Sequence, residues 1–174
     1  MRRTRFHDWP CSVARTVDLL GDWWTPLVLR EAFYGARRFD DFLELGIGRN
    51  ILTERLSRLV EEGVFEKVPY QERPTRFEYR LTDKGRALFG VLAAMIRWGD
   101  DWLAGEEGPP IELVDRRSGE VVRPIVVDER TSEPLDPRTL AVRPGPGFPS
   151  RRHAHELEAK LEGRSERRRA RDHG

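Results

Sequence analysis

Residues 39–63, FDDFLELGIGRNILTERLSRLVEEG, contain two stretches of helical periodicity separated by a glycine-containing break. The first stretch predicts a helix of about two turns, whose apolar face consists of Phe39, Phe42 and Leu43. The break at Gly46–Gly48 precedes a longer stretch in which apolar residues recur at i, i+4, i+7 and i+8: Leu52, Leu56, Leu59 and Val60. Gly63 predicts the end of the second helix. Two helices joined by a glycine-containing turn are typical of a helix-turn-helix.

Two further helices are predicted before this pair. Residues 11–20 carry one apolar face at helical spacing, formed by Cys11, Ala14, Val17 and Leu20. Residues 22–35 begin with two alternative N-caps, Asp22 and Thr25, and Gly35 predicts the end of this helix. A cap at Thr25 would place Pro26 at the first helical position, where its missing N–H costs nothing.

A β-hairpin and a long helix are predicted after the pair. Residues 64–70 and 76–82 alternate apolar with polar side chains around the polar segment QERPT, which favours two strands with a proline-bearing tip. Thr82 and Asp83 then begin a helix over 84–103 that carries too much apolar surface for a lone exposed helix. A second copy of the chain is the simplest partner for it. The fold class is therefore mainly α with a small β-wing (α+β), a winged helix-turn-helix dimer.

The rest of the chain predicts an appendage and a tail. GEEGPP at 105–110 marks a boundary, and 111–127 favours two short strands around Ser118 and Gly119. We therefore expect a winged helix-turn-helix domain over 1–104 and a small β-rich appendage over 105–146. Residues 147–174 are charged and weakly apolar, which predicts a basic tail that is disordered or forms a single helix.

Composition limits the function classes. With 31 basic and 30 acidic residues, the net charge of +1 gives no bulk attraction to nucleic acid, so any affinity must come from local placement. The single cysteine, Cys11, fits a reducing compartment. No signal peptide and no apolar run of about 18 residues is present, so we expect a cytoplasmic protein without a membrane partner.

The outward face of the second helix of the pair is the candidate site for duplex DNA. Arginine can bond guanine bidentately and asparagine adenine, so Arg49 and Asn50, beside Gly48 at the helix start, are the expected base readers. Thr53 and Ser57 share their face, whereas Arg37, Arg38, Arg55 and Arg58 are assigned to phosphates. At the hairpin tip, Arg73 and Arg76 could enter the minor groove or contact backbone phosphate. Surface arginines are common in a chain this rich in arginine. The hypothesis of DNA binding therefore depends on the arrangement of these residues on the helix pair and hairpin, and not on any single one.

The chain resembles the HxlR-type bacterial winged helix-turn-helix regulators, relatives of the MarR type, over about residues 10–104. The resemblance rests on three segments, 11–42 (CSVARTVDLLGDWWTPLVLREAFYGARRFDDF), 46–85 (GIGRNILTERLSRLVEEGVFEKVPYQERPTRFEYRLTDKG) and 97–102 (RWGDDW). It implies a homodimer joined by the first and last helices, a recognition helix at about 48–61, a wing at about 64–82 and an inverted-repeat operator. The expected dimer interface comprises Val13, Val17, Leu20, Leu92, Met95, Ile96, Trp98 and Trp102.

The resemblance also raises two hypotheses about regulation and metal binding. Cys11 matches the position at which some members sense oxidants or electrophiles, and Arg15 one turn later could favour the thiolate. The more ordinary interpretation is that Cys11 is a small buried residue at the dimer interface. Some similar regulators continue into a zinc ribbon. Here the corresponding turns, RRSG at 116–119 and ERTS at 129–132, contain no cysteine, so no metal and no cofactor is expected.

Three other functions are possible for such a chain: catalysis, binding to another protein, and control of DNA binding by a small molecule. An enzyme is disfavoured because no phosphate-binding glycine loop, nucleophile elbow or HExxH motif is present, and His153 with His155 lies in the weakly apolar tail. A winged-helix module that binds another protein remains open, because a fold does not fix a function. A small-molecule effector could occupy an apolar pocket near the tryptophans of the dimer interface, although core packing explains those residues equally well.

Overall fold

The computed structural model describes residues 6–150 and 155–164 of the chain. The chain divides into two compact units by its internal contacts. One, which we call the winged unit, spans Leu19–Val126, and the other, the terminal unit, joins the residues up to Asp18 with those from Val127 onward. The first helix, α1 (Ser12–Leu20), begins in the terminal unit and ends in the winged unit.

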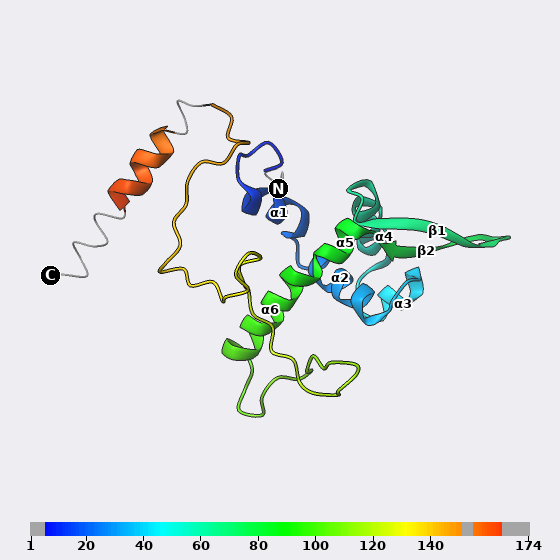
Figure 1. The fold of residues 1–174 in the computed structure, drawn as a ribbon. Helices are drawn as coiled ribbons and strands as arrows, with labels where there is room; N and C mark the ends of the chain where they lie inside the picture. Colours follow the sequence, from blue (N-terminus) through cyan, green and yellow to red (C-terminus); the bar gives the residue numbers. More distant parts are fainter. Residues whose placement is uncertain (1–5, 151–154, 165–174) are drawn as a thin grey trace. The chain divides into compact units, whose positions relative to one another are not determined.

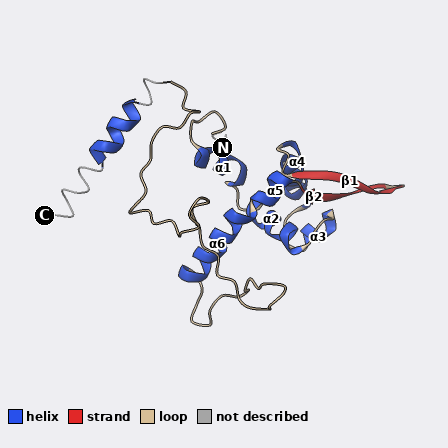
Figure 2. Ribbon diagram, viewed as in Figure 1, coloured by secondary structure: helices blue, strands red, loops and turns tan. Residues whose placement is uncertain are grey.

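The winged unit contains the predicted helix-turn-helix and hairpin. Its elements follow in the order α2 (Thr25–Tyr34), α3 (Phe39–Leu43), α4 (Arg49–Glu61), β1 (Phe65–Glu72), β2 (Thr75–Leu81), α5 (Asp83–Ala87) and α6 (Phe89–Trp102). Figure 1 shows the hairpin reaching out beyond α2, α3 and α4, and Figure 2 marks its two strands in red against the blue helices. The predicted mainly α architecture with a two-stranded wing is confirmed.

One apolar core joins the elements of the winged unit. Fully buried side chains come from α2, α3, α4 and the start of β1, and α6 adds Leu92. The ring of Phe42 lies 6.2 Å from that of Phe65 and 6.4 Å from that of Tyr79, so α3 is packed against the base of the hairpin. Each large apolar side chain buried in this way stabilises the fold by about 1.5–3 kcal/mol. The core therefore fixes α3, α4 and the wing relative to one another.

The carboxylate of Asp22 caps α2. Its Oδ1 accepts hydrogen bonds from the backbone N–H of Trp24, at 3.0 Å, and of Thr25, at 2.9 Å. The Thr25 hydroxyl donates to Oδ2 of the same carboxylate at 2.5 Å. The N-cap residue is Trp24, so neither predicted cap holds that position; Asp22 nevertheless satisfies the first N–H groups of the helix, and Thr25 is its first residue.

The first helix of the pair is shorter than predicted. The sequence favoured about two turns, but α3 ends at Leu43 after five residues. Leu45 and Gly46 then donate to the carbonyls of Phe42 and Leu43, which are i→i+3 bonds of a tighter turn. Gly46 adopts a φ of 76°, a left-handed conformation that suits glycine, and the chain can therefore redirect into α4.

The hairpin is longer than predicted. The antiparallel register runs from Phe65↔Leu81 through Pro69↔Phe77 to Glu72↔Thr75, with an irregularity between Pro69 and Gln71. Pairing therefore continues into the segment expected to form the loop. The tip is left to Arg73 and Pro74, which are joined by a cis peptide bond.

The predicted long helix after the hairpin is interrupted. The Thr82 hydroxyl accepts a hydrogen bond from the Gly85 N–H, which confirms its role as an N-cap. α5 ends at Ala87 and α6 begins at Phe89, because Leu88 and Val91 make i→i+3 bonds to the carbonyls of Gly85 and Leu88. The glycines at 85 and 90 lower the helical propensity on both sides of this break.

The two short strands predicted over 111–127 are wrong. Within the part of the chain that the structure describes, this segment forms only an isolated bridge, Val114↔Val121, around a turn at Ser118 and Gly119. The Asp115 carboxylate accepts from the N–H groups of Arg117 and Ser118, which lowers its pKa. Two backbone hydrogen bonds join the arms of the turn, from the Asp115 N–H to the Glu120 carbonyl and from the Val122 N–H to the Leu113 carbonyl, but the pairing extends no further and no strand forms.

The terminal unit repeats this turn chemistry. The Asp128 carboxylate accepts from the N–H groups of Arg130 and Thr131, next to an isolated bridge Val127↔Pro134. Residues 155–164 form a helix, and the remainder of the predicted tail beyond 150, including His153, lies outside the described residues. None of the helices described is both long and apolar enough to span a bilayer.

Candidate nucleic-acid interface

The polar face of α4 is exposed to solvent because the opposite, apolar face of the helix is buried. Leu52, Leu56 and Leu59 lie in the core of the winged unit. On the opposite side Arg49, Asn50, Thr53 and Ser57 are exposed, as the periodicity predicted. The core therefore sets the orientation of the helix and leaves hydrogen-bonding side chains along its outer surface.

The two expected base readers begin this face. Arg49 is held only loosely, because its Nη2 lies 3.9 Å from Asp40 Oδ1 and its guanidinium carbon 5.8 Å from the centre of the Phe39 ring. An ion pair this exposed contributes about 0–1 kcal/mol, so a bound anion can displace it. The Asn50 side chain makes no hydrogen bond to any of the described residues, and its amide can pair with a ligand.

Thr53 is partly engaged within the helix. Its hydroxyl donates to the Arg49 carbonyl at 2.8 Å, a common arrangement for threonine inside a helix. The hydroxyl oxygen retains its capacity to accept, so Thr53 can contact a donor on a ligand. Gly48 precedes the helix in an extended conformation as its N-cap.

Arg37 and Arg38 are positioned by the start of α3. Their backbone N–H groups donate to Asp41 Oδ2 at 2.9 and 2.8 Å and lower the pKa of that carboxyl. The Arg38 guanidinium lies 4.4 Å from the centre of the Tyr70 ring and 3.6 Å from Glu78 Oε1. Arg38 is thereby oriented across the base of the hairpin, while the Arg37 side chain is exposed.

Two further exposed arginines that were predicted to contact DNA lie at the wing tip. Arg73 and Arg76 flank the tip on either side of Pro74. The turn is stabilised by Gln71, which donates to the Arg73 carbonyl, and by Thr75, which donates to the Glu72 carbonyl. The geometry is compatible with either a phosphate or a minor-groove contact.

Arg55 is paired within the winged unit. Its side chain is only 15% exposed, and its Nε lies 3.0 Å from Asp22 Oδ1, although the N–H is not aligned well enough for a hydrogen bond. Its Nη1 donates to Glu54 at 2.8 Å. Burial alone would raise the pKa of Asp22, but the hydrogen bonds from Thr25, the charge of Arg55 and the bond from Trp24 together lower it. Arg55 therefore links α4 to the start of α2, and its assignment to a phosphate stays a prediction that these contacts disfavour.

The remaining helix arginine, Arg58, is half-buried on the C-terminal half of α4. It lies on the same helix as the base readers but farther from the N-terminal end that usually meets base edges. Its assignment to a phosphate stays a prediction.

Sequence reasoning missed Lys67 on the wing. Its Nζ lies 4.2 Å from the centre of the Phe77 ring, so the charge is held on the hairpin surface between the core and the tip. The alternation of residues 64–70 could have indicated an exposed lysine on β1. The aromatic residue that orients it, Phe77, is on the other strand, and its position depends on the register.

The predicted dimer interface divides into exposed and buried residues. On α6, Trp98 is 58% and Trp102 74% exposed, and Met95 is also exposed. Val13 and Val17 on α1 are exposed, whereas Leu20 and Ile96 are half-buried. Leu92 is 7% exposed and belongs to the core of the winged unit, and its contact with a second copy stays a prediction.

Cys11 immediately precedes α1 and is exposed. Its carbonyl accepts the first backbone hydrogen bond of that helix from Arg15 at 3.1 Å. The structure thus provides the solvent access that a redox-active thiol needs, and its reactivity stays a prediction.

Three comparisons with known proteins agree with this geometry. The family model described as HxlR-like helix-turn-helix matches residues 19–107. An uncharacterised HTH-type transcriptional regulator of Mycobacterium tuberculosis is 46% identical over 138 residues, which is 79% of this chain and 87% of the relative.

Two solved structures extend the similarity beyond the helix-turn-helix. PA1607, a candidate transcription factor, superposes with a TM-score of 0.74 at 42% identity, covering 82% of this chain and all of the other. PA1374 from Pseudomonas aeruginosa, also a candidate transcription factor, gives a TM-score of 0.60 at 37% identity, covering 84% of this chain and 99% of its own. The likeness therefore includes residues after the winged helix.

Proposed function

The chain belongs to the HxlR-like helix-turn-helix family of DNA-binding transcriptional regulators, and from that premise we propose that it binds an inverted-repeat operator as a homodimer. In this proposal α4 lies in the major groove and the wing contacts the flanking backbone or minor groove. Arg49 and Asn50 read base edges, and Arg37, Arg38, Arg58, Arg73 and Arg76 contact the backbone. Lys67 also contacts the DNA backbone in this proposal, whereas Arg55 does not.

The observation that carries the proposal is the exposure of the whole polar face of α4 beside an arginine-bearing wing. The helix has 13 residues, so it is about 20 Å long at 1.5 Å per residue. A helix of this kind fits the major groove, which is about 12 Å wide. Its N-terminal end carries the two side chains with the donor and acceptor geometry for guanine and adenine.

Dimer formation is supported by the exposed apolar face of α6. Trp98, Trp102 and Met95 are too large and too exposed to be favourable on a free monomer. A twofold axis through this face would present two recognition helices about 34–36 Å apart, one turn of DNA. The operator would then be palindromic.

Such a dimer on a promoter would obstruct transcription, so we propose repression in the bacterial cytoplasm. Release from DNA could follow oxidation of the exposed Cys11 or binding of a small molecule. Oxidation is tested by thiol titration of Cys11 against pH and by operator binding before and after peroxide treatment. An ordinary thiol pKa together with unchanged operator binding would exclude oxidative control.

The test of DNA recognition uses two single variants, Arg49→Ala and Asn50→Ala. After selection of an operator from random duplexes, each variant is expected to lose about 1–3 kcal/mol of discrimination per half-site, about 5- to 150-fold for each half-site, between the operator and a scrambled duplex. Urea unfolding should be unchanged, because both side chains are exposed. Arg116→Ala, an exposed arginine after α6, is the matched control and should bind as the wild type does.

The same experiment distinguishes the protein-interaction module. Wild-type binding with no sequence preference, or log affinity that hardly changes with log salt, would favour a protein partner over DNA. Full sequence preference in both variants would remove Arg49 and Asn50 from the reading face.

A further inference from the structure

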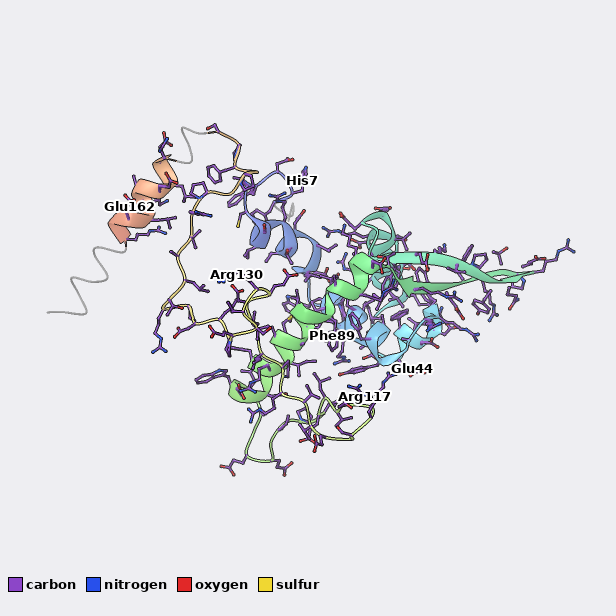
Figure 3. All side chains as sticks on the ribbon, viewed as in Figure 1. His7, Glu44, Phe89, Arg117, Arg130 and Glu162 are labelled. Carbon is purple, nitrogen blue, oxygen red and sulfur yellow. The ribbon has the colours of Figure 1, made fainter. Side chains whose placement is uncertain are left out.

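A small apolar pocket lies between α2 and α6 within the winged unit. Its volume is about 210 Å³. α2 contributes Leu27 and Phe33, α6 contributes Phe89, Leu92 and Ile96, and the segment after α6 folds back to add Leu113. Phe89 is labelled on α6 in Figure 3, and its ring lies 5.2 Å from that of Phe33. The pocket thus has walls from three parts of the chain and an aromatic pair in its lining.

The size and lining of the pocket select one kind of occupant. A cavity of about 150 Å³ lined by leucine, isoleucine and phenylalanine can bind benzene. The pocket here is somewhat larger, mostly apolar and open to solvent on one side, so it suits a single aromatic ring with a short polar substituent. The Tyr34 phenol is the one hydroxyl group in the lining and can serve as a hydrogen-bond partner.

The one charged lining residue favours a neutral occupant. The Arg30 Nη2 and Nε lie 2.6 and 3.0 Å from Oε1 of Glu31, so the guanidinium is already paired. Its carbon lies 5.8 Å from the centre of the Tyr34 ring. A carboxylate entering the pocket would lose its hydration and would have to compete with Glu31 for Arg30, whereas a neutral ring would lose little of its hydration.

The position of the pocket connects it to the proposed function. Leu92, in the lining, belongs to the core that holds α4, and Phe33 packs against that core. α6 also carries Trp98 and Trp102, the exposed residues assigned to the dimer interface. A ring wedged between α2 and α6 would therefore change the angle between the DNA-binding core and the dimer helix.

We infer that this pocket is the binding site of a small, neutral, aromatic effector that alters operator affinity. The effector role rests on the proposed function, whereas binding to the pocket does not. A change in the α2–α6 angle would be transmitted to the spacing of the two recognition helices, which the operator fixes at about one DNA turn. The effect is expected on operator affinity rather than on fold stability alone.

The test uses p-cresol as the probe and p-toluate as its anionic counterpart of similar shape. Ligand-observed NMR without DNA should show saturable p-cresol binding at one molecule per chain, with a Kd of about 0.1–1 mM for so small a molecule. Binding of p-toluate should be at least about tenfold weaker, since its carboxylate would lose hydration and would have to compete with Glu31 for Arg30.

Two tryptophan variants on the same segment locate the site. Leu113→Trp changes a wall of the pocket and should weaken p-cresol binding at least about tenfold, whereas the control Ile111→Trp, at an exposed residue outside the lining, should not. Circular dichroism of both variants checks that they remain folded. On the wild type, saturating p-cresol should shift operator affinity at least about threefold.

Several results would overturn the inference. These are absence of saturable binding, equal loss in both tryptophan variants, or binding that leaves operator affinity unchanged. Binding that disappears as the protein concentration rises into the dimer range would assign the pocket to a side chain of a second copy. If the protein bound no DNA at all, the NMR titrations would still report on the pocket, so failure of the proposed function is distinguishable.

Discussion

The ion pair between Asp22 and Arg55 makes a testable connection between the start of α2 and α4. Asp22 accepts two backbone N–H groups and the Thr25 hydroxyl, and Arg55 Nε lies 3.0 Å from its Oδ1. Asp22→Ala removes the cap and the counter-charge together. Asp22→Asn retains a good capping residue and removes only the charge.

The expected costs follow from these contacts. Loss of an N-cap costs about 1 kcal/mol. Leaving the charge of a buried pair without its partner costs about 3–5 kcal/mol, which we reduce to about 2 kcal/mol because the two side chains are 13% and 15% exposed. Asp22→Ala should therefore lower the free energy of unfolding by about 3 kcal/mol, and Asp22→Asn by about 2 kcal/mol.

A double-mutant cycle in urea isolates the pair. Arg55→Met keeps the volume and removes the charge, so Asp22→Asn should cost at least about 1 kcal/mol less in that background than in the wild type. Additive costs would refute the pairing. If Arg55→Met weakened DNA binding at unchanged stability, with a lower salt slope, Arg55 would instead contact a phosphate.

The pair also predicts a pH dependence. The folded-state pKa of Asp22 is below its ordinary value of 3.8, so the ionised carboxylate contributes stability that is present above about pH 4. That contribution is lost as the pH falls through the folded pKa. The stability difference between wild type and Asp22→Asn should therefore shrink below pH 3.8, and a constant difference would contradict the argument.

Three further changes have definite expected outcomes. Replacing Arg73 and Arg76 together with alanine should weaken binding to all duplexes alike and, since the homodimer carries four such arginines, lower the salt slope by about 4 in gel shifts; a selective loss for one sequence would indicate base reading instead. Trp98→Glu should weaken dimer formation in analytical ultracentrifugation without unfolding the chain, because Trp98 is exposed, and a fully dimeric variant would exclude α6 from the interface. Gly85→Ala should lower the free energy of unfolding by about 1–3 kcal/mol, since the added Cβ would lie 2.2 Å from the Val64 carbonyl oxygen; unchanged urea unfolding would show that the backbone yields.

The sequence predicted those parts of the fold whose causes are local. The apolar period of α4, the alternation in the hairpin and the Thr82 cap each depend on residues close together in the chain, and all three are confirmed. The outward face of α4 followed from the same period, so Arg49 and Asn50 are exposed as expected. Their contact with DNA stays a prediction.

Other features of the structure are not revealed by local pattern. Arg55 looked like any other arginine on a helix, but the fold brings it to Asp22, which local pattern could not reveal. Leu92 packs into the core of the winged unit, a contact that depends on how α6 meets the other elements and that helical period alone does not reveal. The 111–127 segment favoured two strands and does form the turn at Ser118 and Gly119, but its backbone pairing stops after one bridge, Val114↔Val121.

The distribution of charge explains how a chain with a net charge of +1 can attract DNA. Near α3, α4 and the hairpin, three of the acidic groups are bound to the protein itself: Asp41 to backbone N–H groups, Asp22 to α2 and Arg55, and Glu78 to Arg80 and Arg38. The hydrogen bond from Arg80 is the main reason that the pKa of Glu78 is lowered. Because these carboxylates are ionised and already paired, the exposed arginines of the wing and of α4 can meet phosphates at close range, even though the molecule as a whole is nearly neutral.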